Sequence, residues 1–302
     1  MKLKYCIEEI DKNKYENIHS LLKNELHISN RLLTKLIEQN CICLNNSICD
    51  TRNSFEVHDM LTIDFEYFED NTNVVSTKMD LDIIYEDEWL LIINKPAGIA
   101  IHPSILHYAD SLSNGVKFYF DSIGLQKKIS PVNRLDFNTS GLVIFAKCAY
   151  IQEALSKQMN ENLFKKEYLC IVEGVLDKKT GSIDLPIARK PGSIIERCID
   201  STGQPSRTIY KVIKEFQSNS QNDMKSLSLV KCRLETGRTH QIRVHFSHIG
   251  HPLLGDTLYG NSSPLITRQA LHSYMISFVH PITKKEQCFT CPFPDDMKDL
   301  LT

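Results

Sequence analysis

A short run near the middle of the chain combines residue types that acid–base or nucleophilic chemistry uses. Arg134 and Asp136 lie two positions apart in a loop rich in turn-forming residues, Asn133-Arg134-Leu135-Asp136-Phe137-Asn138-Thr139-Ser140-Gly141. A carboxylate held in a rigid loop can act as a base or as a nucleophile. The apolar residues 142–146 predict a buried strand that would hold this loop. On local chemistry alone, however, Asp136 is better explained as a turn residue bonded to its own backbone.

A second polar run, residues 233–245, contains the guanidinium of Arg243, which could pair with a carboxylate elsewhere in the fold and orient it. A rival interpretation is a metal site built from His240, His245, His248, His251 and Asp256. If residues 239–245 form a strand, His240 and His245 point to opposite faces, and the helical H-E-x-x-H spacing is absent. We therefore expect no metal here.

In order and spacing, these runs resemble the signatures of the RluA-like pseudouridine synthases. Residues 133–147 are similar to the family string H-R-L-D-x-x-T-S-G-L-L-L-x-A-K, and residues 233–245 to R-L-x-T-G-R-T-H-Q-I-R-V-H. Residues 86–98 resemble the opening E-D and N-K-P-x-G segment of the family, and residues 166–174 resemble its K-x-Y-x-x-x-V-x-G strand. The likeness extends from about Asp82 to the C-terminus.

The resemblance implies a role for each matching residue. Asp136 corresponds to the catalytic carboxylate, Arg243 to its basic partner, and Tyr168 to a tyrosine that contacts the target base. Arg134 corresponds to an arginine at the RNA-facing rim that helps to occupy the space left by a flipped nucleotide. Asn133 replaces the usual family histidine, so it keeps hydrogen-bonding ability and loses a titratable cation. We expect further RNA contacts from Asn133, Arg238 and His240.

The first 68 residues predict a separate unit. Helical spacing of leucine and isoleucine in 15–27 and 32–37, the Asn45-Asn46 turn, and alternation over 61–65 predict two helices, a hairpin and a strand. This order resembles the small alpha-L RNA-binding module, an α/β unit, although Asn30 interrupts its usual Ser-Arg pair. Residues 1–79 hold 9 Lys and Arg against 13 Asp and Glu, which gives −4. Two roles remain open: packing or a protein contact, and RNA binding by Lys23, Arg31 and Lys35.

The rest of the chain predicts the catalytic domain, residues 80–302, after a polar linker at 69–79. Strand-like runs occur at 142–146, 168–172, 208–216, 227–234 and 271–279, with a hairpin over 83–93 and one amphipathic helix over 151–159. Many strands with few helices predict an α+β fold. Together with the resemblance, this implies a pseudouridine synthase fold with a mixed, largely antiparallel central sheet.

The implied reaction isomerises a uridine in RNA: the base is cleaved from ribose, rotated and rejoined through a ring carbon. No cofactor is expected. Asp136 could attack covalently or remove a sugar proton to form a glycal, and the sequence leaves both routes open. Large-subunit ribosomal RNA is the expected substrate, because relatives that combine the two modules commonly act there. The alternative substrate is transfer RNA. The alternative function is RNA binding without catalysis, which the presence of Asp136, Tyr168 and Arg243 together disfavours.

Composition places these motifs in an ordinary globular protein of 302 residues, 42% hydrophobic and 24% charged. The net charge of −2 gives no overall basic surface, so RNA would have to bind a locally positive groove. We expect a cytoplasmic monomer without a membrane span, because no secretory signal or long apolar run is present. The ten cysteines predict reduced thiols, and strand spacing would point Cys288 and Cys291 to opposite faces.

Overall fold

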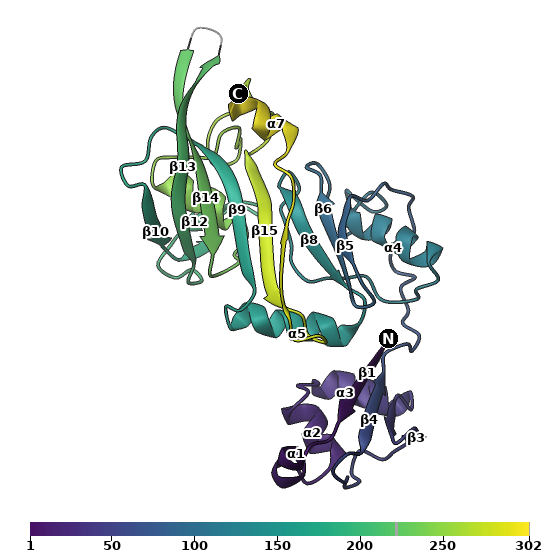
Figure 1. Ribbon diagram of the computed structural model, residues 1–302. Helices are drawn as coiled ribbons and strands as arrows, with labels where there is room; N and C mark the ends of the chain where they lie inside the picture. The colour runs from purple at the N-terminus through teal and green to yellow at the C-terminus, as the bar shows by residue number, and fades with distance from the viewer. Residues whose placement is uncertain (221–222, 302) are drawn as a thin grey trace.

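Two β-sheets of different size organise the chain in the computed structural model, which describes residues 1–220 and 223–301. A four-stranded sheet belongs to the N-terminal unit and a ten-stranded sheet to the remainder. Figure 1 shows the large sheet above the N-terminal unit. A third sheet has two strands, β11 (Ile187–Arg189) and β12 (Arg197–Ile199).

The N-terminal unit is an antiparallel sheet in the order β1-β4-β2-β3. Its elements are β1 (Lys2–Cys6), α1 (Glu9–Lys14), α2 (Ile18–Asn24), α3 (Asn30–Glu38), β2 (Ile42–Leu44), β3 (Ser47–Ile48) and β4 (Met60–Asp64). Asn17 caps α2 by accepting a hydrogen bond from Ser20 N at 2.9 Å, and Ser29 caps α3 in the same way. The sequence predicted all of these elements except β1 and α1, which are too short to show a clear period.

The large sheet has the order β10-β13-β14-β9-β15-β8-β6-β5, with β7 paired to β8 and β16 to β15. Its strands are β5 (Ile83–Glu86), β6 (Leu90–Lys95), β7 (Ser130–Pro131), β8 (Ser140–Ala146), β9 (Lys165–Glu173), β10 (Thr180–Asp184), β13 (Arg207–Ser220), β14 (Asp223–Leu234), β15 (Leu271–Val279) and β16 (Glu286–Thr290). Only β8 and β15 run parallel among the paired strands of the described residues. The expected mixed, largely antiparallel sheet is confirmed.

Both faces of this sheet are covered near its middle, and every residue of β8 is buried. Side chains of β8 alternate: Leu142 and Ile144 join the core beside α5 (Ala149–Asn160), whereas Val143 and Phe145 join the core beside α4 (Leu112–Ser122) and α6 (Gln241–His248). A smaller cluster lies under α7 (Asp295–Lys298) and the final turn η1 (Asp299–Leu301). No helix in the described ranges is both long enough and apolar enough to cross a bilayer.

Residues 239–245 differ from the strand considered in the sequence analysis, because a helix begins at Gln241. His240 has a left-handed backbone, with φ +58°, which ends the extended path. The buried Gln241 side chain then accepts hydrogen bonds from Arg238 N and Thr236 Oγ1 at 3.0 and 2.8 Å. These contacts tie the segment just before α6 to the first residue of the helix.

The cysteine spacing behaves as predicted. Cys288 is exposed on β16, whereas Cys291, just beyond it, is buried. All ten cysteines are free.

Gly141 at the start of β8 gives a test of how closely β8 and β15 approach. Its φ is +112°, and a Cβ there would lie 2.3 Å from the carbonyl oxygen of Ser273. We expect Gly141→Ala to lower the free energy of unfolding by about 3 kcal/mol or more in a urea titration. Gly124→Ala, at φ +70° with open space around it, should lower it by only about 1 kcal/mol. Equal losses would contradict the close approach.

Candidate active site

A cleft of about 580 Å³ opens on the face of the sheet that α4 and α6 cover. Its wall combines segments around residues 131–139, 159–168 and 234–243, which are far apart in the sequence. Asp136, Tyr168 and Arg243, predicted from three separate motifs, all line it.

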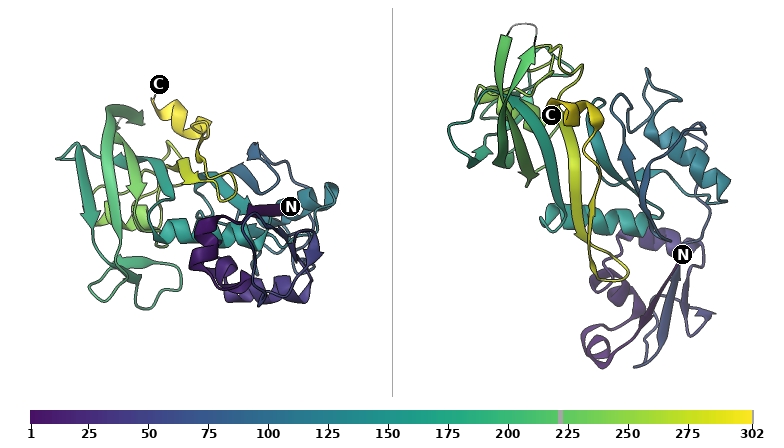
Figure 2. Two further views of the ribbon diagram at one scale, coloured as in Figure 1. Left: turned by 60° about the horizontal axis from the view of Figure 1, so that its bottom comes forward. Right: turned by 45° about the horizontal axis from the view of Figure 1, so that its top comes forward.

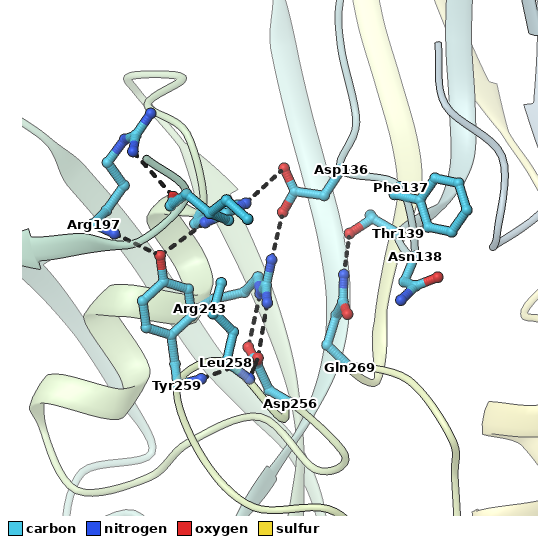
Figure 3. A network of polar contacts seen from close by, with 12 residues as sticks. Asp136, Phe137, Asn138, Thr139, Arg197, Arg243, Asp256, Leu258, Tyr259 and Gln269 are labelled. Carbon is cyan, nitrogen blue, oxygen red and sulfur yellow. Dashed lines mark hydrogen bonds and ion pairs between the residues drawn. The ribbon is translucent and has the colours of Figure 1, made fainter. Parts of the chain in front are cut away.

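Asp136 faces Arg243 across this cleft, as Figure 3 shows. Arg243 Nη1 lies 3.3 Å from Asp136 Oδ2, and the carboxylate is 20% exposed, so it is reachable from the cleft. The other two guanidinium nitrogens are occupied: Nε and Nη2 donate to Asp256 at 2.7 and 2.8 Å. Arg243 is therefore held in one orientation by Asp256 and offers its free end to Asp136.

The surroundings of Arg243 keep it charged. Burial alone would lower the pKa of Arg243, but the contacts with Asp256 and Asp136 outweigh that effect and the pKa is raised. Asp256 Oδ1 also accepts hydrogen bonds from Leu258 N and Tyr259 N, at 3.1 and 3.3 Å. The Tyr259 ring lies 5.1 Å from the guanidinium carbon. A fixed positive charge beside Asp136 is the result.

His240 lies on the other side of the Asp136 carboxylate. Its Nε2 is 3.8 Å from Asp136 Oδ1, and its Nδ1 is 2.8 Å from the Tyr259 hydroxyl, which also accepts from Arg197 N at 2.8 Å. Burial lowers the pKa of His240, and the charge of Asp136 offsets this only in part. A largely neutral imidazole at neutral pH follows, so Arg243 supplies the cation next to Asp136.

A buried lysine supports the loop that carries Asp136. Lys95 is completely buried, and its amine donates to the carbonyl oxygens of Pro96, Ile99 and Phe137 at 2.8, 2.9 and 3.0 Å. The Asp136 carbonyl accepts from Thr139 N at 3.1 Å, which closes the turn. Burial lowers the pKa of Lys95 to about 7, although the charge of Asp136 raises it.

The residues predicted to contact RNA occupy different positions. Arg134 and Arg238 are exposed and line the cleft. Asn133 is only 8% exposed: its Nδ2 donates to Leu142 O at 3.0 Å, and its Oδ1 accepts from Ile144 N at 2.9 Å. Asn133 therefore anchors the loop to β8. It also lines the cleft, and its predicted RNA contact stays a prediction. Tyr168 is 6% exposed, and burial raises its pKa.

The histidines of the rival metal interpretation are dispersed. His245 is buried, with Nδ1 2.9 Å from Thr208 Oγ1 and Nε2 3.0 Å from Leu185 O. His251 Nδ1 lies 2.9 Å from Glu173 O. Within the described ranges, no group of three or more His, Cys, Asp and Glu side chains is arranged to hold a metal ion.

Sequence reasoning gave no positioning role to Asp256, Tyr259 or Lys95. A usable signal for Asp256 existed, because a buried arginine needs more than one acceptor and Asp256 lies only 13 residues after Arg243. For Lys95 and Tyr259 the deciding contacts are to backbone carbonyls and to a ring nitrogen of distant segments, which have no pattern in the sequence.

Comparisons with known proteins agree with this architecture. Residues 89–248 match the family model described as RNA pseudouridylate synthase. The chain is 38% identical over 278 residues to YjbO of Bacillus subtilis, called an uncharacterized RNA pseudouridine synthase, which covers 92% of this chain and 95% of that protein. It is 33% identical over 274 residues to ribosomal large subunit pseudouridine synthase D of Nitrosomonas europaea, with 88% of this chain and 77% of that protein covered.

A solved structure, human RNA pseudouridylate synthase domain containing 1, has a TM-score of 0.58 and 26% identity over 70% of this chain and 83% of that chain. Fold and cleft together define an RNA-modifying α+β enzyme of the pseudouridine synthase type. The chain belongs to the RNA pseudouridylate synthase family, whose members are isomerases acting on RNA.

Lys95 predicts a pH dependence of stability. Its pKa is about 7 in the folded chain and about 10.5 when exposed, so between these values the unfolded chain binds the extra proton. The free energy of unfolding should therefore rise with pH above about 7, with a limiting slope of about 1.4 kcal/mol per pH unit. Lys95→Met should lack this contribution. Urea titrations of both proteins between about pH 6 and pH 9 measure the difference, and parallel curves would contradict the shift.

Proposed function

We propose that this chain converts a uridine in large-subunit ribosomal RNA to pseudouridine, with Asp136 as the catalytic carboxylate. The observation that carries this proposal is the placement of Asp136 in the cleft, 3.3 Å from an arginine that Asp256 holds in position. The choice of RNA is supported by the relatives named for large-subunit pseudouridine synthesis, such as that of Nitrosomonas europaea.

The chemistry is an internal exchange of bonds, so its atoms balance without another reactant. The bond from ribose C1′ to uracil N1 breaks, a bond from C1′ to C5 forms, and the proton lost from C5 is replaced by one at N1. Asp136 serves as nucleophile if it bonds to the sugar or base, and as base if it removes a sugar proton. In both routes Arg243 fixes the direction of the carboxylate.

Access to the glycosidic bond requires the target uridine to leave its stack, which costs a few kcal/mol. The ring of Tyr168, in the wall of the cleft, supplies a surface for the extruded base. Arg134 and Arg238 are exposed at the same cleft and provide positive charge for the RNA backbone. His240 adds a polar contact beside Asp136.

The proposal also covers the oligomeric state, the cellular location and the domain boundaries of the chain. We propose a monomer that acts in the cytoplasm, where ribosomal RNA is found. Residues 1–68 form the alpha-L-like unit, 69–79 the connecting segment and 80–302 the catalytic domain.

Asp136→Asn tests the chemistry directly. The substitution nearly preserves shape but removes the charge and basicity, so pseudouridine formation should fall by at least about 10² to 10⁴-fold. RNA affinity should change little, because binding depends on other groups. Asp177→Asn, on the exposed surface outside the cleft, is the matched control. Wild-type turnover by the folded Asp136→Asn protein would refute the mechanism, and poor RNA binding as its only defect would assign Asp136 to recognition.

Substitutions at Tyr168 test the base contact. Tyr168→Phe keeps the aromatic face, so a loss of activity would report the hydroxyl. Tyr168→Leu keeps an apolar side chain in the core but removes the face, so kcat/KM should fall by about 5 to 150-fold, the equivalent of roughly 1 to 3 kcal/mol of stacking. Thermal melts check that both variants fold. Equal activity of all three proteins would remove Tyr168 from the site.

A further inference from the structure

The N-terminal unit and the large sheet meet in a packed core. Phe65, just after β4, is completely buried; its ring stacks on Tyr150 of α5 at 5.3 Å between centroids and meets the edge of Trp89 at 6.0 Å. One apolar cluster contains Leu36 of α3 together with Ile144 of β8. Figure 1 shows the N-terminal unit below α5, and it lies next to α5 in the views of Figure 2 as well. The two units therefore share one core.

Lys127 ties this junction together through polar contacts. Its side chain is 3% exposed, its amine donates to the carbonyl oxygens of Phe65 and Tyr67, and it lies 4.2 Å from the centroid of the Tyr67 ring. Its own carbonyl oxygen accepts a hydrogen bond from Asn71 Nδ2 at 2.9 Å. Since a buried ammonium is costly without such partners, residue 127 is held at both ends by the segment leaving the N-terminal unit.

Lys127 also lies directly before the segment that leads to Asp136. Ser130 and Pro131 form β7 and pair with β8. Val132 N then donates to Ile144 O at 2.7 Å, and Asn133 bonds to β8 through its amide. Successive residues from 130 to 133 are thus fastened to β8, and only residues 128 and 129 separate Lys127 from this segment.

Two polar side chains, that of Ser29, which caps α3, and that of Lys35 in α3, contact residues at the same junction. Ser29 Oγ donates to Glu153 of α5 at 2.7 Å. Lys35 Nζ pairs with Glu69 at 2.8 Å and lies 4.5 Å from the Tyr67 ring centroid. Lys35 is one of three cations that could form an RNA-binding patch on this unit, and its amine is already engaged by Glu69 and the Tyr67 ring, although the side chain is 40% exposed. The 9 basic and 13 acidic residues of 1–79 also disfavour contact with phosphates.

We propose that the N-terminal unit is a fixed part of the catalytic body that positions Asp136 through Lys127, and is not a tethered RNA-binding arm. The inference rests on the proposed role of Asp136. Lys127 touches no substrate and acts as a positioning residue. Because it orders the catalytic loop without contacting RNA, its loss should lower kcat and leave KM and RNA affinity unchanged.

Lys127→Met in the full chain tests the junction, because methionine keeps the apolar stem and removes the donors. At temperatures below the melting transition of the Lys127→Met protein, we expect its kcat to be at least about tenfold lower than that of wild type. Its KM and its Kd for RNA should stay within about twofold of the wild-type values. Amide hydrogen exchange in residues 128–136 should accelerate by about tenfold or more, which reports loosening of the segment. Phe65→Leu, which retains an apolar side chain at the junction, should act in the same direction if Lys127→Met folds poorly.

Lys147→Met is the matched control. Lys147 is also nearly buried, at 6% exposed, but its amine contacts Glu86 and the Asp87 carbonyl inside the catalytic domain. The kcat of the Lys147→Met protein should stay within about twofold of the wild-type value, even if this variant is less stable. Charge reversal of Lys23 and Arg31 together should leave the Kd for RNA within about twofold.

An unchanged kcat in folded Lys127→Met and Phe65→Leu would overturn the proposal. So would a loss of RNA affinity above about tenfold on charge reversal, which would indicate an RNA-binding arm. The hydrogen-exchange measurement requires no turnover. Failure of the junction is therefore distinguishable from failure of the proposed reaction, and unchanged exchange in residues 128–136 would also count against the junction.

Discussion

The guanidinium of Arg243, shared between Asp256 and Asp136, is the interaction on which the site depends. A buried arginine is costly unless several acceptors surround it, and Asp256 supplies two of them at 2.7 and 2.8 Å. Asp256 is itself held by backbone N–H groups after α6. Because Asp256 holds the Arg243 guanidinium in one orientation, the third nitrogen, Nη1, can direct the Asp136 carboxylate. The carboxylate therefore gains its orientation from a segment more than a hundred residues away in the sequence.

The large sheet makes that meeting possible. β8 and β15 run parallel for a short stretch at Gly141 and Ser273, where the backbones approach too closely for a side chain. This contact brings the loop before β8 next to the segments around β9 and α6. Below the loop, Lys95 and Asn133 bond to backbone carbonyl and amide groups, so the loop is supported from inside the protein. Arg134, on the outer face of the loop, is exposed and lines the cleft.

The N-terminal unit takes part in the same architecture. Its composition and its helix-helix-hairpin order suggest a separable module, yet Phe65 enters the core beneath α5. A polar connecting segment usually indicates flexibility, but here Asn71 is buried against Lys127. Polar residues such as asparagine occur both in flexible linkers and in buried junctions. Which of the two they form depends on the residues that pack against them.

The sequence by itself determined the family, the α+β class and several residues that line the cleft, such as Asp136, because ordered strings such as Arg134-Leu135-Asp136 carry chemistry and turn preferences together. Hydrophobic periodicity also predicted most strands of the large sheet. Only the tertiary structure decided that residues 241–248 are helical, that Asn133 anchors the loop, and that Asp256 and Lys95 belong to the site. These outcomes depend on contacts between segments distant in the chain, including bonds to backbone atoms that every residue carries, and local patterns do not encode such contacts.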